Sequence, residues 1–126
     1  MKRLFIDTNI LIDFSKGYDE LLKNLFKKQI RKELELCINS IVVAEFTTDN
    51  KLQSSQLLDK AESFLLSFMI FPITARLGFT AGRLLREKQV DYLGDGIIAA
   101  TCLEHNLELV TRNKKHFRNV LGLKYI

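Results

Sequence analysis

Short apolar runs alternate with longer amphipathic segments along the chain, and this alternation constrains the fold more than any other feature. Runs of strand length lie at residues 3–6, 34–38, 70–73, 107–111 and 123–126. Between them, apolar residues three and four positions apart predict helices at 19–30, 40–46, 56–69, 74–88 and 94–106. Strands that alternate with helices predict an α/β fold, with helices flanking a central, mainly parallel sheet of four to five strands.

Polar residues and one proline predict where several of these elements begin or end. Asp7-Thr8-Asn9 follows the first strand in a pattern typical of a helix start. Ser40 and Thr74 are predicted N-caps of the helices that follow them. Pro72 indicates the end or the edge of its strand, because proline has no N–H to donate to a neighbouring strand.

The composition limits the size and the location of the protein. A chain of 126 residues with one proline and six glycines predicts a single domain over residues 1–126. Its longest apolar run, 64–73, is far shorter than the ~20 residues of a membrane span, so we expect a cytoplasmic protein without a membrane segment. Cys37 and Cys102 lie in apolar stretches without a CxxC motif, which predicts buried, reduced thiols.

Basic residues exceed acidic ones, and the excess is concentrated in two segments. Nineteen Lys and Arg face fifteen Asp and Glu, a net charge of +4. The segment 111–126 carries no acidic residue and five basic ones, which are Arg112, Lys114, Lys115, Arg118 and Lys124. A second basic cluster, within 23–32, has helical spacing and is either a solvated helix face or a binding face. The excess is compatible with a polyanionic partner but does not establish one.

Three carboxylates stand near strand ends or helix starts, where open α/β sheets bind ligands. Asp7 ends the first strand. Glu45 interrupts a helix that is otherwise apolar on all sides, so its charge must find a partner or line a cleft. Asp95 precedes an apolar, small-residue segment at 97–100. Each has a structural alternative: Asp7 and Asp95 as helix caps, and Glu45 as a salt-bridged surface residue.

A sheet that gathers these carboxylates would need a cation, because their mutual repulsion is otherwise severe. Hard oxygen ligands suit Mg²⁺ or Mn²⁺, which typically also bind waters and substrate phosphate oxygens. Such an ion activates water and offsets charge in a phosphoryl transition state. Together, Asp7, Glu45 and Asp95 therefore predict a metal site suited to phosphodiester hydrolysis.

Four motifs follow one another along the chain, with 38 residues from position 7 to 45, 50 from 45 to 95 and 18 from 95 to 113. They are Asp7-Thr8-Asn9, Val43-Ala44-Glu45, Asp95-Gly96-Ile97-Ile98-Ala99-Ala100-Thr101, and Leu109-Val110-Thr111-Arg112-Asn113 followed by His116-Phe117. This set resembles the PIN-domain ribonucleases. The compact length is most similar to the VapC toxins of bacterial and archaeal toxin–antitoxin pairs.

The resemblance implies a PIN-like three-layer sandwich and an endoribonuclease that leaves 5′-phosphate and 3′-hydroxyl ends. It implies that Asp7, Glu45 and Asp95 are catalytic residues that hold Mg²⁺ or Mn²⁺. A fourth family position, often Asp, is Asn113 here; its amide oxygen adds no charge, so we expect one strong metal site. The resemblance further implies a toxin that forms a homodimer and is blocked by a small antitoxin.

Supporting roles follow from the chemistry of nearby residues. Thr8, Asn9 and Thr111 have short polar side chains that can orient carboxylates or waters, and each is equally plausible as a cap or turn residue. Arg112, Lys114 and Lys115 are candidates for contacts with the RNA backbone or for a solvated loop. A general-base role for His116 is not required, because metal-activated water needs no histidine.

Two other functions are compatible with parts of the sequence. A catalytically silent PIN-like module that binds RNA or protein is favoured only by Asn113 in place of an acid. An unrelated Mg²⁺-dependent phosphotransfer enzyme is disfavoured, because the chain has neither a DxD after the first strand nor a GxxxxGK[ST] loop. The apolar stretch 64–71 either packs in the core or forms a dimer or antitoxin surface.

Overall fold

A five-stranded, all-parallel sheet forms the centre of the computed structural model, which describes residues 1–18 and 20–126. The strands are β1 (Lys2–Ile6), β2 (Leu34–Asn39), β3 (Met69–Phe71), β4 (Glu108–Val110) and β5 (Lys124–Tyr125). Their order across the sheet is β3-β2-β1-β4-β5. The predicted α/β fold with a parallel central sheet is therefore confirmed.

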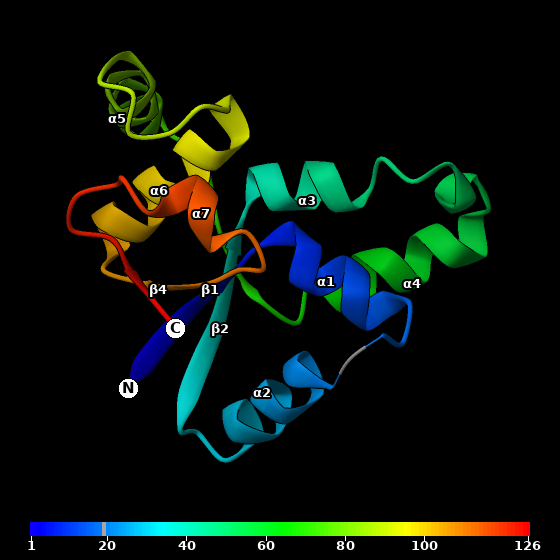
Figure 1. Cartoon of the computed structure of the whole chain (residues 1–126). Helices are drawn as coiled ribbons and strands as arrows, with labels where there is room; N and C mark the ends of the chain where they lie inside the picture. Colours follow the sequence, from blue (N-terminus) through cyan, green and yellow to red (C-terminus); the bar gives the residue numbers. More distant parts are fainter. Residues whose placement is uncertain (19) are drawn as a thin grey trace.

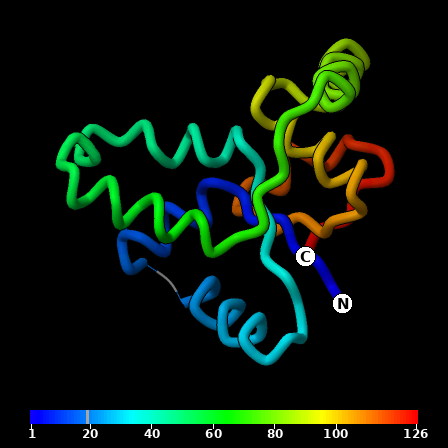
Figure 2. Tube along the Cα trace, turned by 180° about the vertical axis from the view of Figure 1, so that it is seen from behind, coloured from blue at the N-terminus to red at the C-terminus, as the bar shows by residue number. Residues whose placement is uncertain are grey.

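Helices cover both faces of the sheet and complete three layers (Figure 1). One layer holds α1 (Thr8–Ser15), α2 (Leu21–Ile30), α3 (Ser40–Phe46), the short 3₁₀ helix η1 (Asn50–Gln53) and α4 (Ser55–Leu65). The other holds α5 (Ala75–Arg86), α6 (Leu93–His105) and α7 (Lys114–Phe117). Figure 2 shows the same separation from behind. Among the described residues, no helix is long and apolar enough to cross a membrane.

The core lies between the sheet and both helix layers. Leu4, Phe5 and Ile6 of β1 are fully buried, as expected for a central parallel strand covered on both faces. Cys37 and Cys102 are buried and not joined to each other, which confirms that prediction. Burial raises the pKa of the Cys37 thiol to about 12, so this thiol stays protonated.

Two predicted helix boundaries are wrong, because contacts between residues of different elements determine where these helices begin and end. Asn39, not Ser40, caps α3: its side chain accepts a hydrogen bond from the Val42 N–H at 3.1 Å and donates one to Thr101 at 2.9 Å. The helix predicted at 56–69 ends at Leu65. The apolar repeat continues past that end because Phe68, four residues after Phe64, still packs on it, with ring centroids 5.5 Å apart.

Other boundaries shift by one or two residues. Strand β3 covers 69–71 rather than 70–73, and Pro72 follows this edge strand directly, as predicted. Thr74 caps α5 by accepting from the Leu77 N–H at 3.2 Å, as predicted, but the helix stops at Arg86. Lys88 has a φ of 59°, which is incompatible with a continued right-handed helix. The predicted helix start at position 19 lies outside the described residues.

Candidate active site

The carboxyl ends of β1 and β4 meet at the point where the strand order reverses. The chain leaves β1 towards β2 and leaves β4 towards β5 on the opposite side, an arrangement that opens a ligand crevice in α/β sheets. The Asp7 N–H donates to the Val110 carbonyl at 3.0 Å, and the Arg112 N–H donates to Asn9 Oδ1 at 3.2 Å. These contacts join the two loops into one platform.

Asp7 is buried at the centre of this platform, and both of its carboxylate oxygens accept hydrogen bonds. Oδ1 accepts from the Thr8 N–H at 2.7 Å, so Asp7 does cap α1. Oδ2 accepts from the Thr111 hydroxyl at 2.7 Å and from the Asn9 amide at 3.3 Å. Burial raises the pKa of Asp7, while these hydrogen bonds counteract the rise. The capping and functional interpretations of Asp7 are thus compatible.

Glu45 reaches the same platform from α3. Its Oε1 accepts a hydrogen bond from the Thr8 hydroxyl at 2.7 Å, and its Oε2 would lie 3.4 Å from a Cβ added at Gly94. Although this helix is apolar in composition, it is not buried on all sides, because Ala44 and Glu45 are exposed and Val42 is its buried residue. Glu45 is therefore exposed at the carboxyl end of the sheet, with the Thr8 hydroxyl as its partner.

Asp95 lies in the first turn of α6, beside Gly94, and is half-buried. Its pKa is raised chiefly by burial and further by the charges of Asp7 and Glu45, while His116 lowers it. The structure thus brings Asp7, Glu45 and Asp95 together, and we call these three residues the acidic cluster. The repulsion from Asp7 and Glu45 adds to the effect of burial on Asp95.

His116 contacts the acidic cluster, although no role in the site was predicted for it. Its Nδ1 lies 3.2 Å from Asp95 Oδ2, and its ring packs against Tyr92 with centroids 5.6 Å apart. A signal existed in the sequence, because position 116 lies one helical turn after Asn113 and near the carboxyl end of β4. Which way its side chain points depends on how α7 packs against α6.

The residues of the acidic cluster fit a hard divalent cation in donor type and in charge. Among residues 1–18 and 20–126, no lysine or arginine forms an ion pair with these three carboxylates. No three His, Cys, Asp or Glu side chains of that described part already surround a common point. A closed cage is not required for Mg²⁺, which typically takes one or two carboxylates and keeps several waters.

The remaining predicted residues lie around the cluster with different partners. Asn113 is exposed, and its backbone N–H, rather than its side chain, donates to Thr111 Oγ1 at 3.0 Å. Arg112 is engaged in an ion pair with Asp13, with Nε 2.7 Å from Oδ2. Lys114 and Lys115 are exposed at the start of α7. Within the described part of the chain, the two lysines form no ion pair, whereas Arg112 is held by Asp13.

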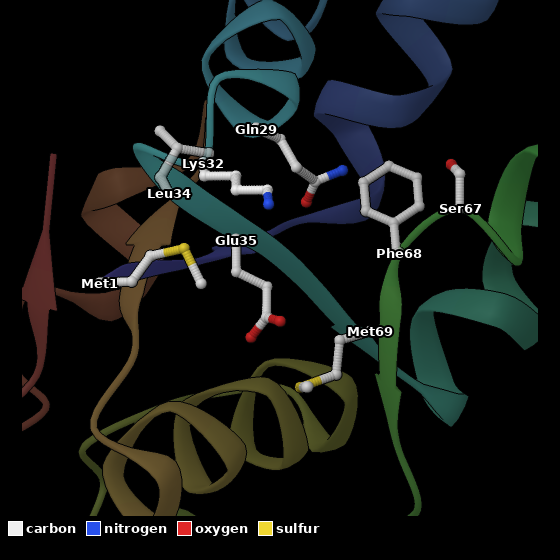
Figure 3. Close-up of a pocket in the computed structure, with 8 residues that line it drawn as sticks. All are labelled: Met1, Gln29, Lys32, Leu34, Glu35, Ser67, Phe68 and Met69. Carbon is white, nitrogen blue, oxygen red and sulfur yellow. The ribbon is translucent and has the colours of Figure 1, made fainter.

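A separate cavity of about 400 Å³ lies at the opposite end of the sheet (Figure 3). It is lined by residues at or near the starts of β1, β2 and β3 and by neighbouring helical residues, namely Met1, Gln29, Lys32, Leu34, Glu35, Ser67, Phe68 and Met69. Glu35 is the only carboxylate among these lining residues and Lys32 adds a positive charge, so this cavity lacks the group of carboxylates found at the other end of the sheet.

The chain is similar over nearly its whole length to known proteins of one family. The family model for the PIN domain matches residues 4–122. Ribonuclease VapC2 of Rickettsia felis is 30% identical over 125 residues, which are 94% of this chain and 92% of that protein.

Solved structures agree with this relationship. A toxin–antitoxin complex from Klebsiella pneumoniae gives a TM-score of 0.73 at 30% identity, covering 95% of this chain and 94% of the other. VapBC2 from Rickettsia felis, bound to a DNA fragment from its promoter, gives a TM-score of 0.78 at 28% identity, covering 98% and 97%. The resemblance predicted from the motifs is confirmed: the chain belongs to the PIN domain family.

Proposed function

We propose that this chain is a Mg²⁺- or Mn²⁺-dependent endoribonuclease and the toxin of a toxin–antitoxin pair. A ribonuclease and toxin–antitoxin complexes stand among its relatives. The observation that carries the proposal is the convergence of Asp7, Glu45 and Asp95 at the carboxyl end of the sheet. These three carboxylates lie where the strand order reverses, and their partners are hydroxyl, amide and imidazole groups rather than lysines. Such a set of ligands suits metal-assisted hydrolysis of a phosphodiester.

The chain's own side chains would divide the work into holding and orienting. Asp7, Glu45 and Asp95 would hold the ion, which supplies activation of the attacking water and neutralisation of charge on the phosphate. Thr111 and Asn9 orient Asp7 through their hydrogen bonds to Oδ2. The Thr8 hydroxyl orients Glu45. Such outer partners typically determine the geometry and the basicity of metal ligands.

The RNA strand would approach from the side of α7. Lys114 and Lys115 are exposed there and would contact backbone phosphates, which provides affinity without sequence preference. Water attacks the phosphorus, the bond to the 3′ oxygen breaks, and the products carry a 5′-phosphate and a 3′-hydroxyl. Asn113 would contribute at most a neutral oxygen, so we propose one strong metal site.

We also propose the setting in which the protein acts. Residues 1–126 form a single domain, the chain forms a homodimer in the cytoplasm, and a small antitoxin blocks the acidic cluster. The structures of related proteins as toxin–antitoxin complexes support the antitoxin partner. Co-purification of the chain with the product of a neighbouring small reading frame, and loss of cleavage in that complex, would test this partner.

Cleavage of structured RNAs by purified protein, with Mg²⁺, Mn²⁺ or EDTA, tests the activity. We expect cleavage that depends on the metal and falls by at least ~100-fold in Asp7→Asn and Asp95→Asn, the scale for losing transition-state charge stabilisation. Asp59→Asn is the matched control, since Asp59 is exposed on α4, a helix that carries none of the proposed site residues. Full cleavage by Asp7→Asn would refute the mechanism. Tight RNA binding without any cleavage by wild type would instead identify a silent binding module.

A further inference from the structure

Tyr92 presents an aromatic ring to solvent beside the acidic cluster. It directly precedes α6, whose first turn carries Asp95. The residue is 61% exposed, and its neighbour Leu93 is 62% exposed. Phe79 and Tyr18 are more exposed still, so what distinguishes Tyr92 is its place next to the helix turn that carries Asp95.

His116 contacts both this ring and the carboxylate of Asp95. The Tyr92 and His116 rings pack with centroids 5.6 Å apart and planes tilted by 42°. The other contact of the imidazole is to Asp95 Oδ2, 3.2 Å from Nδ1. The tyrosine ring and a proposed metal ligand therefore share one contacting side chain.

The backbone that carries Tyr92 is held on both sides. Val90 is 3% exposed, and the Gln89 side chain accepts a hydrogen bond from the Leu121 N–H at 3.1 Å. On the other side, the Tyr92 carbonyl accepts from the Gly96 N–H at 3.0 Å. The Tyr92 hydroxyl makes no hydrogen bond to the described residues. The ring is thus presented by a fixed segment, while its own polar end stays available.

Cationic groups complete the surroundings of the ring. Lys114 and Lys115 are exposed in the same helical turn that holds His116. Proteins that bind single-stranded nucleic acid combine cationic side chains, which follow the backbone, with aromatic rings on which unpaired bases stack. A base inside a duplex is stacked on both faces and is not available to such a ring.

We propose that Tyr92 is the platform on which an unpaired RNA base stacks next to the scissile phosphate. This inference rests on the proposed ribonuclease function and adds to it a residue that positions the substrate by contacting a base. His116 positions the ring, and the two lysines contact the flanking phosphates. An RNA that is fully paired at the same sequence would be a poor substrate.

The test uses a stem–loop RNA with 2-aminopurine in its loop and a fully paired duplex carrying the same base. Binding is measured in EDTA by the quenching of 2-aminopurine on stacking, and kcat and KM are measured with Mn²⁺. Tyr92→Ala should weaken binding of the stem–loop by about 5- to 150-fold, the range for loss of one base–aromatic stack, and should abolish quenching. Tyr92→Phe and Tyr92→Trp should retain both.

Tyr18→Ala is the matched control, since Tyr18 is 72% exposed but follows the far end of α1 from Asp7. Thermal melting shows whether each variant folds, and Tyr92→Leu replaces the alanine variant if that one does not. Unchanged affinity and quenching in folded Tyr92→Ala, with cleavage by wild type intact, would overturn the inference and leave the proposed function standing. Wild type that neither binds nor cleaves RNA would overturn both. Loss of antitoxin binding alone would assign the ring to a protein partner and refute the inference.

Discussion

The two ends of the parallel sheet treat charge in opposite ways. At the end where the strands begin, charged groups find partners: Lys2 Nζ lies 3.5 Å from Glu108 Oε2, and the Arg3 guanidinium donates to the His105 carbonyl at 2.7 Å. At the end where the strands finish, Asp7, Glu45 and Asp95 have hydroxyl, amide and imidazole neighbours, and the described residues supply no lysine or arginine to pair with them. Charged groups therefore have ionic or polar partners at one end of the sheet, whereas the other end gathers three carboxylates.

This difference indicates that the end of the sheet with the acidic cluster is the less stable of the two. Partly buried carboxylates that repel one another reduce the free energy of unfolding, and such perturbed groups concentrate at functional sites. A cation bound to the acidic cluster would remove the repulsion, whereas the paired end has no such need. The contrast can be tested with matched substitutions at the two ends.

The largest expected difference is between two glutamates. Glu45→Gln removes a charge from the acidic cluster and should lower metal-dependent RNA cleavage by at least ~100-fold. Glu35→Gln alters the carboxylate in the cavity at the opposite end and should leave cleavage unchanged. Single-turnover cleavage rates measure both. Equal cleavage rates for the two variants would refute the proposal that the acidic cluster, and not the opposite end of the sheet, carries the activity.

The two histidines of the chain provide the second comparison. His116→Ala removes the partner of Asp95 and should weaken Mn²⁺ binding by about 10- to 100-fold, as is typical when a residue that orients a metal ligand is lost. His105→Ala removes a ring stacked on Phe71 and should not affect Mn²⁺ affinity. Titration calorimetry decides between these outcomes; an equal loss in both variants would show a general folding defect instead.

Stability without metal gives a smaller effect, of the opposite sign to the activity. Burial and the charges of Asp7 and Glu45 raise the pKa of Asp95 in the folded chain above its ordinary value of 3.8, so its ionisation destabilises the fold as pH rises from that value through the folded pKa. Asp95→Asn should raise the Tm at pH 7 by about 3–5 °C, the effect of ~1 kcal/mol in a domain of this size.

The pH dependence of that gain separates the possible causes. The difference in Tm between Asp95→Asn and wild type should shrink below pH 3.8, where both side chains are neutral, and should be fully developed at neutral pH. Melting curves in EDTA measure it. A large loss of Tm in this variant would show that Asp95 serves mainly as a structural residue of the first turn of α6.

The smallest effect is expected at the paired end. Glu108→Gln breaks an ion pair with Lys2 that lies at the surface. The Glu108 side chain is 33% exposed and the Lys2 side chain 52% exposed, and such pairs contribute less than about 1 kcal/mol to stability. We expect a small decrease in Tm. Added salt should make the difference in Tm between the variant and wild type smaller, because salt screens the ion pair in wild type. A gain in stability like that expected for Asp95→Asn would show that the Lys2–Glu108 pair does not stabilise the fold.

Much of the fold could be predicted because its signals are local. The apolar run of β1 and the helical repeat of α5 depend on residues close in sequence, and their alternation restricts the sheet to parallel pairing. Predictions failed where packing from elsewhere produced the same pattern. Phe68 continues the helical repeat of α4 although it lies beyond the helix, because it fills the same aromatic cluster as Phe64.

The candidate site divides in the same way. Asp7 could be selected because strand ends gather ligands in such sheets, and Glu45 and Asp95 because charges stand out against apolar neighbours. The exposure of Glu45 could not be predicted, since it depends on how α3 crosses the end of the sheet. The contacts of His116 with Asp95 and Tyr92 were equally inaccessible, because they join α7 to the start of α6.

The sequence by itself determined the alternating elements, the parallel sheet and the identity of the acidic residues, because periodicity and residue type are properties of short segments. Only the tertiary structure decided that these acids meet, which hydroxyl serves which carboxylate, and that an imidazole and a tyrosine ring stand beside Asp95. Those facts depend on contacts between residues up to 104 positions apart, as between Thr111 and Asp7. Such contacts follow from the crossing of packed layers, which local patterns do not encode.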